Sequence, residues 1–184
     1  MPVRVTVKPR FGMIHGRFQP FHNGHWEYLQ LAAARCETLI IGITNPDPSQ
    51  IAEEEIACHR HRADSNPYTF FERQLMIREA LLNGGYNLDR IIFIPFPINF
   101  PDRWQYYVPS DVVHYVRIFS IWEQTKVDRL RAAGHAVEVL QEGIEKAIEA
   151  TEVRRRMRTG EPWEELIPAA TARVLRSIQE ARAL

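Results

Sequence analysis

Three side chains near the N-terminus could bind a phosphate group and stabilise its charge: Arg17, His22 and His25. An arginine stays charged at physiological pH, and an imidazole donates hydrogen bonds to phosphate oxygens, more strongly when it is protonated. Gly24, between the two histidines, would let a ligand approach the backbone closely. These residue types at this spacing predict a site for phosphate chemistry. Paired histidines near a helix start can also serve only to cap the helix or to bind an adventitious metal.

The elements around these residues would place them at the edge of a sheet. An apolar run over 11–15 predicts a strand, and the spacing of apolar residues over 26–35 predicts a helix. A helix that begins here offers unpaired N–H groups and a partial positive charge to an anion. The segment 16–25 is therefore expected to be a phosphate-binding turn from strand to helix.

A second basic run lies near the C-terminus. Thr151 is a suitable N-cap for a helix over 151–158, and Arg154 and Arg155 fall in its first turns. Arginine is normally more favourable at the end of a helix than at its start, so a polyphosphate over the helix start would explain the pattern. The alternative is a helix face that is simply exposed to solvent.

The remaining pattern alternates strands with helices. Further strands are predicted at 38–44, 90–95, 112–119 and 136–140, and further helices at 68–83, 123–133 and 169–183. A helix cap just before the fourth strand leaves a helix there as an alternative. The alternation indicates an α/β fold with a parallel sheet and right-handed crossovers, whose ligands sit where the strand order reverses. We expect a single domain over 1–184 with a C-terminal helical segment from about 151.

Composition excludes several classes of protein. The 184 residues carry 23 basic and 23 acidic side chains, which gives no bulk attraction to nucleic acid or to a membrane surface. No apolar run approaches the ~20 residues that span a bilayer, and the first residues lack the apolar core of a signal peptide. Cys36 and Cys58 make no disulfide framework, so we expect a cytoplasmic protein. The histidines around Cys58 fit no standard zinc spacing, and no protein metal site is predicted.

The string GRFQPFHNGH, from Gly16 to His25, resembles the HxGH signature of the nucleotidyltransferase superfamily, in the form found in archaeal-type nicotinamide-mononucleotide adenylyltransferases. The resemblance implies a Rossmann-like, doubly wound parallel sheet of about five strands with helices on both faces. It also implies that Arg17, His22 and His25 are catalytic. By the same resemblance, the nucleotide is bound by other residues of the string and by the later basic helix: Gly16, Phe18, Gln19, Gly24, Thr151, Arg154 and Arg155.

Two other stretches match the family in part. Residues 66–69, followed by the pair Glu72-Arg73, resemble the family's Asn-Pro-Phe-Thr segment, and functional and structural roles for Arg73 stay equally open. The element at 149–155 matches apart from Glu149, which stands where the family has a serine.

The region expected to hold the acceptor, 96–122, departs most from the family. Trp104 lies where the family places an aromatic ring against the nicotinamide, and an indole can stack on a pyridinium, although aromatics in proline-rich loops more often only pack. Trp122 is the second expected acceptor contact, in a segment, 120–123, that replaces the family's Gly-Asn-rich stretch. The loop at 45–65 is longer than usual, and the segment 45–67 is expected to form a lid or a partly helical excursion.

The resemblance implies transfer of the AMP part of ATP to nicotinamide mononucleotide, with release of pyrophosphate and formation of NAD. The divergent acceptor region leaves an alternative open, a cytidylyltransferase that couples CTP to an alcohol phosphate or a phosphonate. A nucleotide-binding regulatory module is a third possibility. The two intact histidines argue for an enzyme, because a module that only binds a nucleotide needs no donors to a transition state. The expected cofactor is Mg²⁺, held mainly by substrate phosphates. The expected partners are a nucleoside triphosphate and a small phosphate-bearing acceptor, with no nucleic acid and no membrane, and we expect a homo-oligomer.

Overall fold

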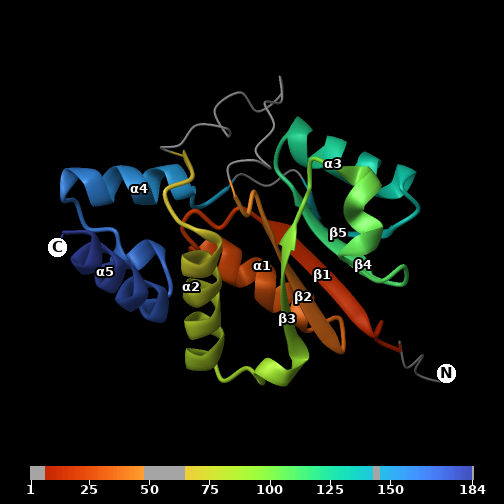
Figure 1. Ribbon diagram of the computed structural model, residues 1–184, viewed down its shortest axis with the longest axis horizontal. Helices are drawn as coiled ribbons and strands as arrows, with labels where there is room; N and C mark the ends of the chain where they lie inside the picture. Colours follow the sequence, from red (N-terminus) through yellow and green to blue (C-terminus); the bar gives the residue numbers. More distant parts are fainter. Residues whose placement is uncertain (1–6, 48–64, 143–145, 184) are drawn as a thin grey trace.

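A parallel sheet of five strands in the order β3-β2-β1-β4-β5 forms the centre of the computed structural model, which describes residues 7–47, 65–142 and 146–183 (Figure 1). The strands are β1 (Phe11–Gly16), β2 (Thr38–Thr44), β3 (Ile91–Phe96), β4 (Val113–Ile118) and β5 (Ala136–Glu142). Each strand pairs in parallel with its neighbours, so the expected Rossmann-like α/β sheet is confirmed. The strand order reverses between β1 and β4, which is where such sheets bind ligands.

Helices cover both faces of this sheet. They are α1 (Asn23–Ala33), α2 (Phe70–Asn83), α3 (Ile121–Ala132), α4 (Ala150–Thr159) and α5 (Ala169–Ala183). Helices α4 and α5 lie beside α2 at one end of the molecule, on the left of Figure 1, and α3 lies toward the other end. The C-terminal helices therefore extend the layer that α1 and α2 begin.

Successive residues of the central strand enter two different apolar cores. Ile14 of β1 belongs to the cluster that contains Leu29 of α1 and Ile77 of α2, whereas Met13 belongs to the cluster that contains Val127 of α3. Because side chains alternate across a strand, a sheet covered on both faces needs apolar residues at every position. This requirement explains the unbroken apolar runs in the sequence.

Two helix starts differ from the sequence prediction. Helix α1 begins at Asn23, earlier than expected, because His22 caps it. Helix α4 has Glu149 as its N-cap residue, without a capping hydrogen bond from the side chain, so the prediction that Thr151 caps this helix is wrong. The expected cap at Thr69 is present, where the side chain accepts from the backbone N–H of Glu72.

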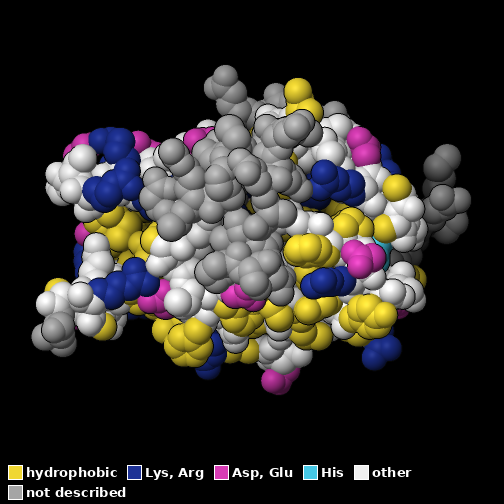
Figure 2. Space-filling view, turned by 45° about the horizontal axis from the view of Figure 1, so that its top comes forward, with side chains coloured by type: hydrophobic (Ala, Val, Ile, Leu, Met, Phe, Trp, Pro, Cys, Tyr) yellow, Lys and Arg dark blue, Asp and Glu magenta, His cyan; other side chains and the backbone are white. Residues whose placement is uncertain are grey.

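Several large apolar side chains are exposed at the surface. Phe71 on α2 and Ile121 on α3 are 70% and 75% exposed, and Ile92 on the edge strand β3 is 40% exposed. Figure 2 shows apolar side chains gathered along the lower margin of that view, with few charges among them. A homo-oligomer stays a prediction. Within the described ranges, no helix is long and apolar enough to cross a bilayer.

Arg73 hydrogen-bonds to the backbone at and just beyond the carboxyl ends of β1 and β2. Its side chain is 1% exposed, and its guanidinium donates to the carbonyl oxygens of Arg17 (2.9 Å), Thr44 (2.7 Å) and Asn45 (2.8 Å). Burial lowers the pKa of Arg73 to about 10, which still leaves it charged at neutral pH. All of these contacts are with backbone carbonyls, so they favour the structural role that the sequence left open.

We therefore expect Arg73→Lys to destabilise the fold. A lysine cannot reproduce the planar fork, so at least one buried carbonyl loses its donor, at a cost of roughly 1–3 kcal/mol in the free energy of unfolding. Denaturant melts would measure this loss. The exposed Arg78→Lys on the same helix is the control, and equal stability of the two variants would contradict the structural role.

Candidate active site

The two histidines of the HxGH string form a reciprocal cap at the start of α1. Nδ1 of His22 accepts a hydrogen bond from the backbone N–H of His25 (3.3 Å), and Nδ1 of His25 accepts from the backbone N–H of His22 (3.4 Å). Their rings stack with centroids 3.6 Å apart. A neutral imidazole that accepts through Nδ1 carries its proton on Nε2. The capping role and a binding role are thus compatible, because each ring keeps an N–H donor on its other nitrogen.

Both rings are neutral before an anion binds. Burial lowers the pKa of His22 to about 3, with further lowering by the charges of Lys146 and Arg117. Burial also lowers the pKa of His25 well below its ordinary value, and His22, Lys146, Arg117 and Arg17 add to the effect. A phosphate anion would offset these cations and raise both values. The site is therefore a cationic environment prepared for negative charge.

The turn before α1 fixes the His25 ring by packing. Phe18 is 1% exposed and meets that ring edge-on with centroids 5.0 Å apart, while Phe21 stacks on it at 5.8 Å. Phe18 adopts a positive φ of 53°, which turns the chain sharply after β1. A Cβ at Gly24 would lie 3.1 Å from the His22 ring, so a larger residue there would displace it.

Gln19 and Arg17 join this turn to the segment that precedes α2. The Gln19 amide donates to the carbonyl of Tyr68 and accepts from its N–H, both at 2.9 Å. Arg17 donates to the carbonyl of Ser65 (3.4 Å) and to the side chain of Asn66 (3.5 Å). Two stretches that resemble the family separately in the sequence are thus in direct contact.

A pocket of about 260 Å³ opens beside the two histidines, at the carboxyl ends of β1, β2 and β4 and the starts of α1 and α4. The predicted site residues that line it are Gly16, Arg17, Phe18, Gln19, His22, Gly24, His25, Trp122 and Thr151. The structure therefore brings together most of the predicted residues. It does not place Trp104, Arg154 or Arg155 in the lining.

Three cations that sequence reasoning missed also line the pocket: Arg117, Lys126 and Lys146. Arg117, on β4, donates to the carbonyl of Gly24 (2.9 Å) and pairs with Glu27 (3.2 Å). Its side chain is only 11% exposed. The available signal was an arginine inside an apolar strand run, since a buried charge needs a partner or a ligand.

Helix α3 and the residues before α4 add charges of both signs. Lys126 is 8% exposed, with its ammonium 5.2 Å from the centre of the Trp122 ring. Glu123 accepts a hydrogen bond from the Ser120 hydroxyl and pairs with Lys146 at 3.4 Å. The buried carboxylate is thus compensated, and the pocket keeps a positive balance.

Arg154 links α4 to the HxGH turn from outside the pocket. It is 7% exposed, and its guanidinium donates to the carbonyl of Gln19 (2.5 Å) and to the hydroxyl of Thr151 (3.3 Å). The prediction that Arg154 holds the triphosphate is not supported by this geometry. Arg154 instead fixes the position of Thr151, which does line the pocket.

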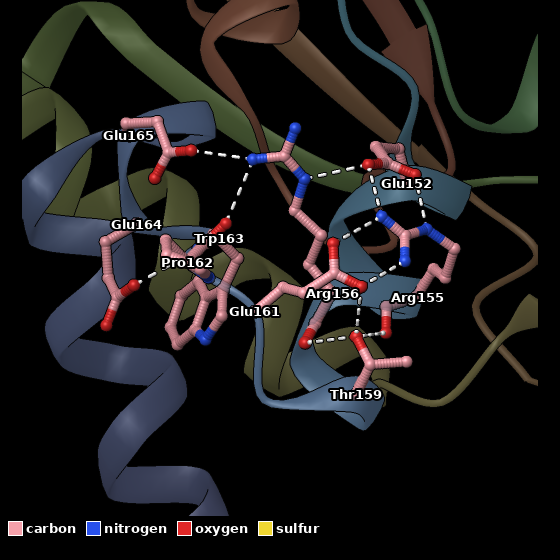
Figure 3. A network of polar contacts seen from close by, with 9 residues as sticks. All are labelled: Glu152, Arg155, Arg156, Thr159, Glu161, Pro162, Trp163, Glu164 and Glu165. Carbon is pink, nitrogen blue, oxygen red and sulfur yellow. Dashed lines mark hydrogen bonds and ion pairs between the residues drawn. The ribbon is translucent and has the colours of Figure 1, made fainter.

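The following arginines lie in a surface network of ion pairs (Figure 3). Arg155 pairs with Glu152 (2.8 Å) and with Glu161, and Arg156 pairs with Glu152 (2.7 Å) and Glu165 (2.7 Å). The expected role of Arg155 in nucleotide binding is not supported by this geometry, because Glu152 on α4 and Glu161 just beyond its end hold the guanidinium. The alternative of a solvated helix face is the better description of these two residues.

Trp104 packs in the core instead of facing the pocket. Its side chain is 1% exposed, its Nε1–H donates to the carbonyl of Pro97 (2.9 Å), and its ring stacks near Phe96 with centroids 5.8 Å apart. The expectation that Trp104 contacts the acceptor is corrected on this ground. Trp122 does line the pocket, and its contact with the acceptor stays a prediction.

We therefore expect Trp104→Phe to lower the free energy of unfolding without changing the acceptor KM. The variant removes the donor to Pro97, which we expect to cost roughly 1–3 kcal/mol in the free energy of unfolding. Initial rates should give an acceptor KM within about twofold of wild type, since no ring contact with the ligand is lost. An acceptor KM that rises in a variant of unchanged stability would restore the stacking role.

The donor set of the pocket fits a magnesium ion held by substrate. Three carboxylates line the pocket: Glu27 pairs with Arg117, Glu123 pairs with Lys146, and Glu149 is the N-cap residue of α4. Mg²⁺ keeps several waters and binds through substrate phosphates together with only one or two protein carboxylates. Among the described residues, no cluster of three His, Cys, Asp or Glu side chains could hold a metal. The histidines around Cys58, and residues 48–64 of the suggested lid, lie outside the described residues.

Comparison with known proteins identifies the family. Residues 13–156 match the Cytidylyltransferase-like family. The chain is 45% identical to a phosphonoformate cytidylyltransferase of Streptomyces viridochromogenes, over 90% of both chains. It is 34% identical to a nicotinamide-nucleotide adenylyltransferase of Thermococcus onnurineus, over 93% of this chain and 84% of the other.

A solved structure agrees with the fold. The bifunctional NMN adenylyltransferase/ADP ribose pyrophosphatase of Francisella tularensis superposes with a TM-score of 0.68 at 17% identity, over 92% of this chain and 49% of that one. The chain thus spans about half the length of that enzyme, and at this identity the likeness concerns the fold alone. Together with the sequence relatives and the histidine pair at the start of α1, it leads to one conclusion: the chain belongs to the cytidylyltransferase-like family and is a nucleotidyltransferase.

Proposed function

We propose that the protein transfers the CMP part of CTP to a small phosphonate that also carries a carboxylate, with release of pyrophosphate. The observation that carries this proposal is the composition of the pocket around Trp122, the predicted acceptor contact. Lys126 lies beside Trp122 there, while Trp104, the expected nicotinamide contact, is buried in the core. A charged lining suits a compact anion better than a flat heteroaromatic ring. The 45% identity with a phosphonoformate cytidylyltransferase supports the same choice.

The reaction is an in-line displacement at the α-phosphorus of CTP. A phosphonate oxygen forms the new P–O bond, and the bond from the α-phosphorus to the bridging oxygen breaks, so that its electron pair leaves with pyrophosphate. The nucleophile is already ionised at neutral pH and needs no general base. The enzyme must instead hold two anions together and stabilise the charge that develops between them.

The lining residues can supply both functions. We assign the Nε2–H groups of His22 and His25 to the phosphate oxygens of CTP, with His25 nearest the reacting phosphorus. Arg17, Arg117 and Lys146 would offset the repulsion between the two substrates. Bound Mg²⁺ would supply further charge neutralisation on the triphosphate.

Adenylyl transfer to nicotinamide mononucleotide, the first expectation from the sequence, is the second candidate. The relatives at about one-third identity favour it: 34% for Thermococcus onnurineus and 35% for Thermococcus kodakarensis. The geometry around Trp104 is the reason to rank it second.

Pyrophosphate release with CTP or ATP, each combined with phosphonoformate or nicotinamide mononucleotide, tests the choice. We expect CTP with phosphonoformate to exceed the other three combinations by roughly 10² or more in kcat/KM, as a site built to hydrogen-bond one substrate discriminates against an analogue. Product mass should equal that of the CMP adduct. Turnover of ATP with nicotinamide mononucleotide alone would reject the proposal in favour of the second candidate.

A further inference from the structure

A buried histidine that lines the pocket has no hydrogen-bond partner among the described residues. His15, at the carboxyl end of β1, is 3% exposed, and neither of its ring nitrogens finds a donor or acceptor among the described residues. It nevertheless lines the pocket. Buried polar groups in folded proteins are nearly always satisfied, so an unsatisfied one that faces a cavity points to a ligand.

In the part of the chain that the structure describes, the aromatic neighbours of His15 offer it no hydrogen bond. Phe96 lies with its ring centre 5.5 Å away, and His114 with its ring centre 5.6 Å away. His114 is itself 0% exposed, and within the described ranges neither of its ring nitrogens has a hydrogen-bond partner. His114 does not line the pocket. Only His15 of this pair can therefore reach a bound ligand.

Lys126 brings a cation to the same place. It lines the same pocket as His15, is 8% exposed, and its positive charge acts on the imidazole. Burial, the charge of Lys126 and the ring of His114 together lower the pKa of His15 well below its ordinary value. The imidazole is therefore neutral and offers one N–H donor to a pocket that also contains the buried Lys126 ammonium. That pair matches a carboxylate, which accepts several hydrogen bonds and carries one charge.

His15 and Lys126 approach the pocket from a different face of the sheet than the HxGH histidines do. His15 alternates along β1 with Ile14 and therefore belongs to the face of the sheet that α3 covers. His22 and His25 stand at the start of α1, on the opposite face. A small acceptor bridging the two sides would have its reacting end near the histidine pair and its other end near His15.

We propose that His15 and Lys126 form the subsite for the carboxylate of the acceptor, and so select carboxylated phosphonates over other phosphonates. This inference rests on the proposed function, because it names the part of that acceptor which the pocket recognises. His15 is a specificity residue here and takes no part in the bond changes.

The test uses His15→Leu, which removes both nitrogens at similar volume, and His15→Gln, which restores an N–H donor. His114→Leu is the matched control, because it removes an equally buried, equally unpartnered imidazole outside the pocket. The acceptors are phosphonoformate and methylphosphonate, which lacks the carboxylate. Rates with saturating CTP are measured beside calorimetric titrations of each acceptor in the presence of an unreactive CTP analogue.

We expect His15→Leu to raise the KM and the dissociation constant of phosphonoformate roughly tenfold or more, the scale of one lost hydrogen bond to a charged group. The KM of CTP and the constants for methylphosphonate should stay within about twofold, and His15→Gln should recover part of the loss. His114→Leu should leave all of these constants near wild type. Equal effects on the two acceptors, or none on either, would overturn the subsite.

The binding titrations distinguish a failure of the carboxylate subsite from a failure of the proposed reaction. Wild-type turnover of phosphonoformate with an unchanged His15→Leu constant would reject the subsite and leave the function standing. Absence of CTP-dependent turnover, with phosphonoformate binding that His15→Leu weakens, would reject the function and support the subsite. Absence of acceptor binding to wild type would reject both.

Discussion

His25→Ala is expected to lower kcat by roughly 10²–10³-fold, the range for removing one donor to a transition-state charge. The ring of His25 is held by Phe18 and Phe21, and its Nδ1 is occupied by the backbone N–H of His22. The donor on Nε2 is therefore fixed before substrate arrives. A fixed donor acts mainly on the barrier, so the KM of the nucleotide should change far less than kcat. Steady-state rates with nucleotide and acceptor varied in turn would measure both.

The same variant also removes half of the reciprocal cap on α1, which by itself costs about 1 kcal/mol of stability. Thermal melting is therefore recorded beside the kinetics, to show that the variant is folded at the assay temperature. His135→Ala is the matched control, because that histidine does not line the pocket and its loss should leave kcat within about twofold. A kcat for His25→Ala within a few-fold of wild type would remove His25 from the chemistry and leave it only the capping role.

The strands were the most predictable part of the fold. The run 38–44 coincides with β2, and the other strands lie within a residue or two of the predicted bounds. The reason is physical: a parallel strand covered on both faces must be apolar at every position, and such runs are distinctive. Helix α5, predicted at 169–183, begins and ends as expected because its apolar spacing is regular. The start of α1 was missed, since a histidine is not among the usual capping residues.

Site residues were predictable where a sequence motif fixes the backbone. They were less predictable where the direction of the side chain determines whether a residue reaches the pocket. His22, His25 and Arg17 lie together because one short turn carries them. Trp104 was placed at a plausible distance along the chain, but the 3-10 turn around it directs the ring into the core. The direction of a side chain in an irregular loop does not follow from residue spacing, as it does in a strand or a helix.

The sequence around Arg155 contains the spacing that explains its ion pairs. Glu152 stands three residues before it and four before Arg156, the two spacings at which side chains meet on a helix surface. The three consecutive arginines therefore fall into two groups, one buried and one in surface ion pairs. Arg154 faces inward and is 7% exposed, whereas Arg155 and Arg156 are held by glutamates.

Arg117 carries the second large expected effect, and no motif pointed to it. Its guanidinium holds the carbonyl of Gly24, inside the first turn of α1, and pairs with Glu27 on the next turn. It also lines the pocket. Arg117→Ala should therefore lower kcat/KM for the nucleotide by roughly 10²-fold, since both a charge near the phosphates and the support of the histidine turn are lost.

Arg117→Lys separates these two contributions. A lysine keeps the charge but cannot bridge Gly24 and Glu27 as a planar fork does. If charge dominates, Arg117→Lys should recover most of the activity; if support of the turn dominates, it should recover little. Combining each variant with His25→Ala gives a double-mutant cycle. If Arg117 acts by positioning the histidine, its substitution lowers kcat/KM less in the His25→Ala background than in the wild type.

Arg131→Ala, on the exposed side of α3, is the control for a lost surface charge. If Arg117→Ala resembles Arg131→Ala in kcat/KM, then Arg117 serves only the packing of α1 against β4, and the positive charge of the pocket must come from the other three cations that line it.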